Sequence, residues 1–364
     1  MATLRRKTPD LVLLLAVLTL LGLGLVMVAS ASTITGLAKA KDAFYYIKHQ
    51  LIFAGLGLLG MFIMMNFDYH HLRRFTRVLA ILAPVMLVLV LIFGQKIGGA
   101  RRWIDLGFFN VQSSEFAKLA LVLILAHFLA ELGEGVRRFG LGVFLPLCYA
   151  ALIAGLVMLE PDFGTVLVVS GTFFCMVFAA GASLWHLGVL AGAALAGLIA
   201  LAVSAPYRLK RLIAFKNPFH DPQGTGYQII QSLYALGSGG PFGVGIGRSR
   251  QKFSYLPEPH TDYIFSILGE EMGLVGTMLV LCLFALIIWR GLRTALAAVD
   301  LYGTLLAVGI TSLLGVQVIL NIGVVTSTLP VTGITLPLLS YGGSSLMVTL
   351  VGLGILLNIS GQAK

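Results

Sequence analysis

Charged residues are scarce in this chain, and that scarcity excludes an ordinary soluble domain. Lysine, arginine, aspartate and glutamate make up 11% of its 364 residues, whereas soluble domains carry about 25%. Hydrophobic residues make up 58%, and the mean hydropathy is +0.96. The composition is typical of a protein that crosses a membrane many times.

Cysteine and acidic residues are also few. The three cysteines, Cys148, Cys175 and Cys282, lie inside apolar runs without CxxC or metal-site spacing, so we interpret them as small core residues. The 15 acidic residues against 25 lysines and arginines give a net charge of +10. Because the basic residues sit between apolar runs, they favour contact with anionic or phosphorylated lipid headgroups, and no pattern suggests nucleic-acid binding.

Long apolar runs are abundant. A bilayer core about 30 Å thick needs roughly 20 helical residues. We therefore predict an all-α polytopic membrane protein with ten transmembrane helices, the first of them retained rather than cleaved as a signal. The predicted helices lie at about 11–32, 46–66, 78–95, 113–131, 142–160, 164–181, 184–204, 263–289, 300–327 and 335–358.

Several further features of the organisation follow. The fifth and sixth helices are separated only by "EPDFG" and should form a tight hairpin. The last two helices are rich in glycine, serine and threonine, which allow close packing in lipid. We see neither an internal repeat nor a linker, so residues 1–364 are predicted to form one membrane domain with one large loop, about 205–262. Residues 228–236 of that loop could form a short interfacial helix.

The distribution of lysine and arginine predicts the orientation. If the N-terminus is cytoplasmic, that side holds eleven basic residues, and the short loops of the other side hold six. The large loop adds seven to the outer side, but long loops follow the rule poorly. We predict cytoplasmic N- and C-termini and an extracytoplasmic large loop. Its seven basic residues are Arg208, Lys210, Arg211, Lys216, Arg248, Arg250 and Lys252.

The stretch "LPEPHTDYIF" places Glu258, His260, Thr261 and Asp262 directly before an apolar helix. Two interpretations remain open. Thr261 or Asp262 could cap the helix. Alternatively, a carboxylate at the bilayer surface is partly desolvated, which raises its pKa and makes Asp262 a usable general base, with Glu258 and His260 tuning it or binding substrate. The two interpretations are compatible.

The segment "GGARRWIDLGFFNVQSSEFAKLA" is the second polar region. Arg102 and Trp103 suit the headgroup level, either as part of an ordinary aromatic and basic belt or as phosphate ligands. Glu115 and Lys118 lie one turn apart on the helix that follows. Because charges inside a membrane are costly, they could form a structural ion pair between helices or serve a polar cleft.

Other polar segments add to this picture. The run "PVTGITLPLLSYGGSS" interrupts the last membrane segment and supplies Ser340, Gly342 and Gly343, which we predict, with Thr261, to bind substrate. Broken backbone at this depth is tolerated where it lines a cavity or is buried in protein. "GSGGPFGVGIG" is interpreted as a flexible turn, since it lacks the context of a nucleotide-binding loop. Glu160 and Asp162 of "EPDFG" are explained by turn chemistry as well as by catalysis.

These polar segments fall on one predicted side of the membrane. Together they offer cations, a carboxylate and an apolar surround, which favours a lipid-linked substrate that carries phosphate. An ion transporter would instead place its charges near the middle of the membrane.

The chain resembles the SEDS family of bacteria, the shape, elongation, division and sporulation proteins. The resemblance covers nearly the whole length, through "LVMVASAS", "ARRWIDLG", "SSEFAKLA", "EPDFGT", "YQIIQSLYALGSGGPFGVGIG", "RQKFSYLPEPHTDYIFSILGEEMG" and "NIGVVTSTLPVTGITLPLLSYGGSS". The segment "SAPYRLKRLIAFKNPFHDP" is more similar to the division and sporulation branch, which is FtsW-like, than to the RodA-like branch. Ser113 departs from the family pattern, which has proline there.

The resemblance implies a peptidoglycan glycosyltransferase of the bacterial cytoplasmic membrane that polymerises lipid II at the outer face. It also implies a class B penicillin-binding protein, a transpeptidase, as partner, together with other division proteins. The family's essential acidic residue maps onto Asp262. The arginine–tryptophan pair maps onto Arg102 and Trp103, and the paired charges map onto Glu115 and Lys118.

On this reading Asp262 removes the proton of the attacking sugar hydroxyl. Lys118, Arg102, Arg248 and Lys252 are candidates to stabilise the departing diphosphate. No carboxylate cluster requires a metal, but a divalent cation, Mg²⁺ or Mn²⁺, on the diphosphate is compatible with the sequence, with Asp262 as a ligand in that case. A lipid II flippase and a scaffold without chemistry remain the alternatives.

Overall fold

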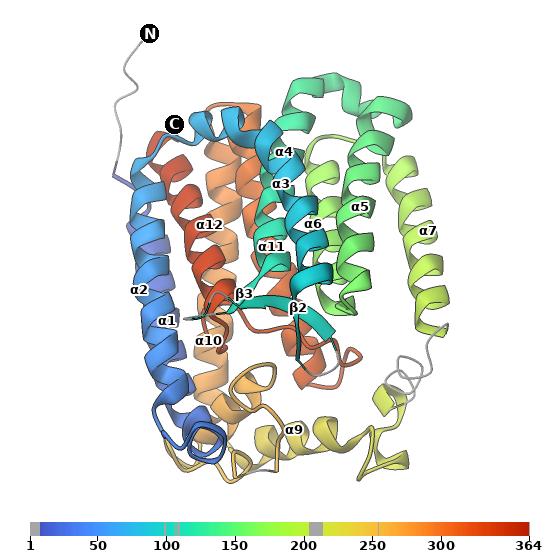
Figure 1. Cartoon of the computed structure of the whole chain (residues 1–364). Coiled ribbons are helices and arrows are strands. Elements are labelled where there is room, and N and C mark those ends of the chain that lie inside the picture. Colours follow the sequence, from blue (N-terminus) through green and yellow to red (C-terminus); the bar gives the residue numbers. More distant parts are fainter. Residues whose placement is uncertain are drawn as a thin grey trace.

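The computed structural model describes residues 8–97, 100–105, 107, 110–203, 214–253 and 255–363. Within these ranges a helix coincides with each of the ten predicted apolar segments (Figure 1), which confirms the helical membrane fold. Eight of the ten have the length and hydropathy of a membrane span, and α6 and α7 add shorter apolar stretches. The ten are α1 (Leu11–Ala40), α2 (Tyr45–Asn66), α3 (Leu72–Phe93), α4 (Ser113–Leu132), α5 (Leu145–Leu159), α6 (Phe163–Ala179), α7 (Leu184–Val203), α10 (Ile264–Ala297), α11 (Leu301–Val325) and α12 (Gly343–Gln362).

Successive helices run in opposite directions, so α1 begins and α12 ends at the same end of the bundle, here called the termini end (Figure 1). Contacts of Asp10 confirm this, because its backbone N donates to Ser360 Oγ at 3.0 Å and its Oδ2 pairs with Arg290 Nε at 2.5 Å. The opposite end, the loop end, carries the loop between α7 and α10 with the predicted short helix, α9 (Tyr227–Ser238).

Some basic residues used to predict the orientation lie outside the described residues. They are Arg5, Arg6, Lys7, Arg208, Lys210, Arg211 and Lys364.

Close helix contacts in the core depend on glycine. A Cβ at Gly309 of α11 would lie 2.5 Å from Val122 Cγ1 of α4. A Cβ at Gly354 of α12 would lie 2.5 Å from the carbonyl oxygen of Met61 in α2. Both distances are far below van der Waals contact, so the predicted role of small residues in the last two helices is confirmed.

Two predicted boundaries are wrong, and one predicted helix contains an interruption. The last helix begins at Gly343 rather than near 335, because residues 326–342 form non-helical backbone that contains Pro330 and Pro337. Helix α1 continues to Ala40, beyond its predicted end at 32. Helix α10 is interrupted at Gly273, whose φ of +66° is non-helical.

A small antiparallel sheet at the loop end was not predicted. It consists of β1 (Gln95–Ile97), β2 (Ala100–Asp105) and β3 (Asn110–Gln112), in that order. Its strands are too short to give a clear alternation of apolar and polar residues. The sheet joins α3 to α4 and thereby positions Arg102 and Trp103 of β2.

Candidate functional site

Asp262 lies at the loop end, two residues before α10 begins at Ile264. Its side chain is half-buried, and Oδ2 lies 3.7 Å from the position that a Cβ would take on Gly333. Gly333 has a φ of +76°, a left-handed conformation that glycine adopts without strain. The carboxylate therefore faces the non-helical segment 326–342 where that segment presents no side chain.

Neither Thr261 nor Asp262 occupies the N-cap position predicted for one of them. Tyr263 takes that position in α10. The hydroxyl of Thr261 instead donates to the carbonyl oxygen of Glu258 at 3.0 Å. A role as the cap residue therefore does not account for Asp262.

Ser340 fixes the backbone beside Asp262. Its Oγ donates to the carbonyl oxygen of Thr261 at 2.6 Å and accepts from Leu336 N at 2.8 Å. The hydroxyl is buried. Ser340 was predicted to bind substrate, and the structure places its hydroxyl between two backbone groups, where it holds the aspartate segment in place.

The residues after Ser340 complete this support. Tyr341 N donates to the carbonyl oxygen of His260 at 2.8 Å, and Gly342 N donates to Gln50 Oε1 of α2 at 3.2 Å. Gly343 opens α12 against Phe53, whose ring a Cβ at that glycine would approach to 2.3 Å. The predicted glycines thus allow a close approach between α12 and α2 next to the site.

Two amides of α11, absent from the predicted site, bind the non-helical segment, and one of them also binds the backbone of Asp262. Asn321 Nδ2 donates to the carbonyl oxygens of Asp262 and Ile334 at 2.9 and 2.7 Å. One turn earlier, Gln317 Nε2 donates to the carbonyl oxygen of Thr335 at 3.2 Å. A buried polar pair on a membrane helix was the available signal for them.

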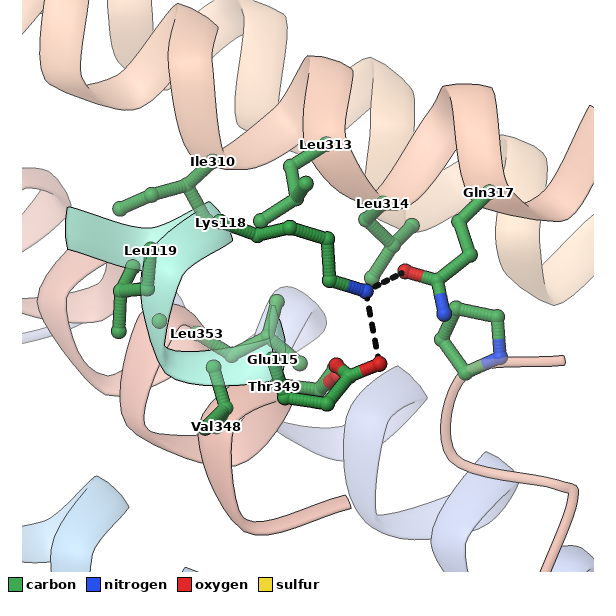
Figure 2. A pocket seen from close by; sticks show the side chains of 12 residues that line it. Glu115, Lys118, Leu119, Ile310, Leu313, Leu314, Gln317, Val348, Thr349 and Leu353 are labelled. Atoms are coloured by element: carbon green, nitrogen blue, oxygen red, sulfur yellow. Dashed lines mark hydrogen bonds and ion pairs between the residues drawn. The ribbon is translucent and has the colours of Figure 1, made fainter. Parts of the chain in front are cut away.

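Lys118 of α4 contacts the Gln317 amide and the carboxylate of Glu115 (Figure 2). Lys118 Nζ lies 2.9 Å from Glu115 Oε1 and 3.3 Å from Gln317 Oε1, and both charged side chains are buried. The pair lies within α4 rather than between helices. It faces a pocket lined by Glu115, Lys118, Leu119, Ile310, Leu313, Leu314, Gln317, Pro337, Val348, Thr349, Gly352 and Leu353. Lys118 is therefore connected to Asp262 through α11.

Arg102 approaches the site from β2. Its Nε donates to the carbonyl oxygen of Glu160 at 3.0 Å, and its Nη2 donates to that of Pro161. Trp103 pairs with Gln112 in the sheet, and Gln112 N donates to Ser344 Oγ of α12 at 3.1 Å. The sheet is thus anchored at the start of the last helix.

The turn between α5 and α6 links Arg102 to the segment that faces Asp262. Asp162 caps α6 by accepting from Thr165 N and Oγ1, both at 3.0 Å. A Cβ on Gly164 would lie 2.8 Å from the carbonyl oxygen of Thr332. Residues 160–164 therefore contact Arg102 on one side and the residue before Gly333 on the other.

The predicted cations of the large loop are placed differently. Lys252 is buried and donates to Glu271 Oε1 at 2.9 Å and to Ser30 Oγ at 3.0 Å. Arg248 is exposed on the glycine-rich loop, which packs on the part of α10 near Glu271. Because the charge of Lys252 is compensated by Glu271, we interpret it as a structural residue.

Glu258 and His260 form the outer edge of the aspartate segment. Glu258 pairs with Lys39 at 2.7 Å, both exposed, while the buried His260 ring lies 4.4 Å from that of Tyr46. Burial lowers the pKa of His260 to about 4, opposed by the nearby Glu258 carboxylate. The ring is therefore neutral at pH 7 and packs against tyrosine.

The structure thus links many of the predicted site residues to the segment of Asp262, either directly or through α11 and the 160–164 turn. The linked residues are Asp262, Thr261, His260, Ser340, Gly342, Gly343, Glu115 and Lys118, with Arg102 and Trp103 joined through the 160–164 turn and Gln317 and Asn321 added. Among the described residues, no group of three or more histidine, cysteine, aspartate or glutamate side chains could hold a metal ion.

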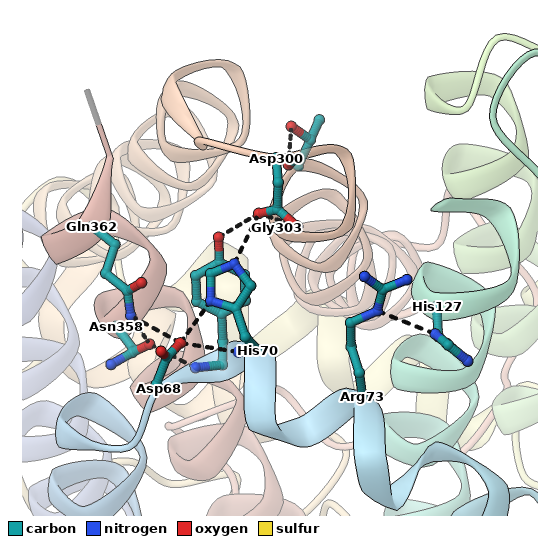
Figure 3. A network of polar contacts seen from close by, with 10 residues as sticks. Asp68, His70, Arg73, His127, Asp300, Gly303, Asn358 and Gln362 are labelled. Atoms are coloured by element: carbon teal, nitrogen blue, oxygen red, sulfur yellow. Dashed lines mark hydrogen bonds and ion pairs between the residues drawn. The ribbon is translucent and has the colours of Figure 1, made fainter. Parts of the chain in front are cut away.

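A second polar network lies at the termini end (Figure 3). Asp68 accepts from His70 Nδ1 at 2.7 Å, and His70 Nε2 lies 3.6 Å from Asp300 Oδ1 at the start of α11. Asn358 Oδ1 accepts from Tyr69 N at 3.1 Å, which joins α12 to the same network. These contacts hold α3, α11 and α12 together at the end of the bundle opposite Asp262.

The chain is similar to known proteins over nearly its whole length. Residues 11–364 match the family of FtsW, RodA and SpoVE, described as cell cycle proteins. Stage V sporulation protein E of Bacillus subtilis (strain 168) is 49% identical over 367 residues, which cover 100% of both chains. A probable peptidoglycan glycosyltransferase FtsW of Trichlorobacter lovleyi is 44% identical over 358 residues, covering 98% of this chain and 94% of that protein.

Solved structures extend the similarity to three dimensions. A chain from a peptidoglycan synthase complex that coordinates polymerization and crosslinking matches with a TM-score of 0.80 and 35% identity, covering 97% of both chains. The rod shape determining protein RodA of Thermus thermophilus matches with a TM-score of 0.70 and 33% identity, covering 97% of this chain and 96% of RodA.

Proposed function

This chain belongs to the FtsW, RodA and SpoVE family of peptidoglycan glycosyltransferases, and we propose that it polymerises lipid II into glycan strands at the outer face of the cytoplasmic membrane. Lipid II is an undecaprenyl-diphosphate-linked disaccharide pentapeptide, so a groove for lipid tails must adjoin a site for diphosphate and sugar. The loop end of the bundle supplies charged and polar groups next to apolar helices.

The position of Asp262 is the observation that carries the proposal. Its backbone oxygen is held by Asn321, and the backbone oxygen of its neighbour Thr261 is held by Ser340, so the backbone that carries the carboxylate is held in place just before α10. A carboxylate positioned in this way can act as the general base. It accepts the proton of the attacking sugar hydroxyl while that oxygen bonds to the anomeric carbon of a second lipid II, and the bond from that carbon to the diphosphate oxygen breaks.

The departing diphosphate takes the electron pair and needs positive charge nearby. Arg102 is our first candidate because its guanidinium contacts carbonyl oxygens and forms no ion pair with the described residues. Lys118 is paired with Glu115 and bonded to Gln317, so we assign it to holding α11 in register with α4. Any Mg²⁺ or Mn²⁺ would enter on the diphosphate, with Asp262 as the protein ligand.

A class B penicillin-binding protein is the proposed partner. The matching chain in the peptidoglycan synthase complex supports this choice, since that assembly couples polymerization with crosslinking. The similarity to stage V sporulation protein E and to FtsW supports a role in sporulation or division, beside other division proteins. The lysine and arginine distribution supports cytoplasmic termini, which puts Asp262 outside.

Purified protein with its partner and lipid II in detergent tests the proposal, because detergent removes sidedness. Long glycan strands on a gel are the expected product. Movement of lipid II across sealed vesicles without any polymer in detergent would contradict the proposal and indicate the flippase.

A further inference from the structure

Glu160, directly after α5, is a buried carboxyl that the mechanism above does not use. Its side chain has no exposed surface, and neither Oε1 nor Oε2 forms a hydrogen bond with the described residues. Asp162, two residues later, differs because both of its oxygens accept from Thr165. Since buried carboxylates are normally paired or hydrogen-bonded, the state of Glu160 needs a physical explanation.

The surroundings of Glu160 favour its protonated form. Burial, followed by the negative charge of Asp162, raises the pKa of Glu160 to about 8, and Arg102 and the hydroxyl of Ser113 oppose this rise. The hydroxyl of Ser113 is itself buried and forms no hydrogen bond of normal geometry with the described residues. The carboxyl is therefore mostly uncharged at pH 7.

The other elements packed around this turn add no further charge. On α4, Glu115 and Lys118 are paired with each other. The non-helical segment contributes Thr332, whose buried hydroxyl also forms no hydrogen bond with the described residues. The charged groups that act on Glu160 are therefore Asp162 in its own turn and Arg102 from β2.

Arg102 is the cation that acts on this carboxyl. The guanidinium donates to the backbone oxygens of Glu160 and Pro161, which leaves its positive charge uncompensated. An ionised Glu160 side chain in the same turn would compensate that charge, because Arg–carboxylate pairs are stronger than contacts with neutral acceptors. The same guanidinium would then be less available to an incoming anion.

We propose that Glu160 is a positioning residue: its uncharged form leaves the charge of Arg102 available to the substrate diphosphate, and its ionised form competes with that diphosphate. The proposal rests on the proposed function and concerns binding rather than proton transfer. It predicts that lipid II binds more weakly at alkaline pH because Glu160, a carboxyl that does not touch the substrate, becomes ionised.

The test compares lipid II affinity at two pH values in a protein that keeps Glu160 and in one with Glu160→Gln. A fluorescent lipid II in detergent serves as the probe, and both proteins carry Asp262→Asn so that no turnover occurs. The dissociation constant should rise about tenfold between about pH 7 and about pH 9 with Glu160 present, because a group of pKa near 8 ionises there. In Glu160→Gln the rise should be absent and the affinity at pH 7 unchanged.

Glu134→Gln is the matched control, since Glu134 is exposed near the termini end and should leave the tenfold rise intact. An equal rise with and without Glu160 would overturn the proposal, and so would an affinity that does not change with pH when Glu160 is present. Failure of the proposed function would be seen in a separate assay, in which wild-type protein with lipid II at pH 7 forms no polymer. The binding comparison does not depend on that result.

Infrared spectroscopy of the wild-type protein provides a second measurement, which does not require that a Glu160 variant folds. A protonated-carboxyl band should be present at pH 7 and disappear toward pH 9. By linkage, undecaprenyl diphosphate should shift this titration to higher pH. A titration that does not respond to the diphosphate would reject the competition.

Discussion

Replacing Asn321 by alanine should inactivate the enzyme by displacing Asp262. The Asn321 amide donates to two carbonyl oxygens, those of Asp262 and Ile334, and the side chain is buried. Each buried acceptor left unsatisfied costs about 1–3 kcal/mol, so the substitution should destabilise the fold by about 2–6 kcal/mol. Loss of this anchor should also reduce the polymerisation rate by about 100-fold, because an error of about 1 Å in position is enough for such a loss.

Asn358→Ala provides the matched control. Asn358 is also buried and contacts two backbone groups, donating to Met65 O at 2.8 Å and accepting from Tyr69 N at 3.1 Å, but at the termini end. It should lower the melting temperature in detergent similarly while keeping the rate near wild type. Equal rates for the two variants, measured well below both melting temperatures, would refute the anchoring of Asp262 by Asn321.

Three further predictions concern stability. Lys252→Met should destabilise by about 3–5 kcal/mol because it leaves Glu271 buried and unpaired, and the double variant with Glu271→Gln should lose less than the two single losses added; additive losses in thermal unfolding would contradict the pairing. His260 has a folded pKa of about 4, below its unfolded value, so the stability that its neutral ring provides should be lost as pH falls from about 6.5 toward 4; a melting temperature that falls equally in His260→Asn would contradict this. Gly273→Ala should lower the melting temperature, since its φ is +66° and a Cβ would lie 2.3 Å from Gly243 N, whereas Gly22→Ala, with nothing within 4 Å, should not; equal effects would argue against the interruption in α10.

Helix positions could be predicted because each span needs a long apolar run, and few other structures satisfy backbone hydrogen bonds in lipid. The start of α12 could not be placed, because residues 335–342 are apolar enough to look like membrane helix, while Pro337 and the hydrogen bonds of Ser340 dictate a different backbone. The small sheet that carries Arg102 was not predicted, because its strands are only three to six residues long and give no clear sequence pattern.

The candidate site shows the same division. Asp262, Glu115 and Lys118 could be named as candidates from sequence because charge beside a membrane helix is unusual. The role of Lys252 could not be inferred, since its partner Glu271 lies in a different element and only folding brings the two together. Arg102 could be named as a cation from sequence, but its position beside Glu160 depends on the turn between α5 and α6.

The most direct test of the account is the rate of lipid II polymerisation by Asp262→Asn, measured in detergent with the partner present and beside the wild type. Asparagine keeps the size of the side chain but cannot accept the proton. The account predicts a loss of about 100-fold or more with lipid II binding unchanged, as expected when a general base is removed. Glycan synthesis by this folded variant at a rate near wild type would contradict it.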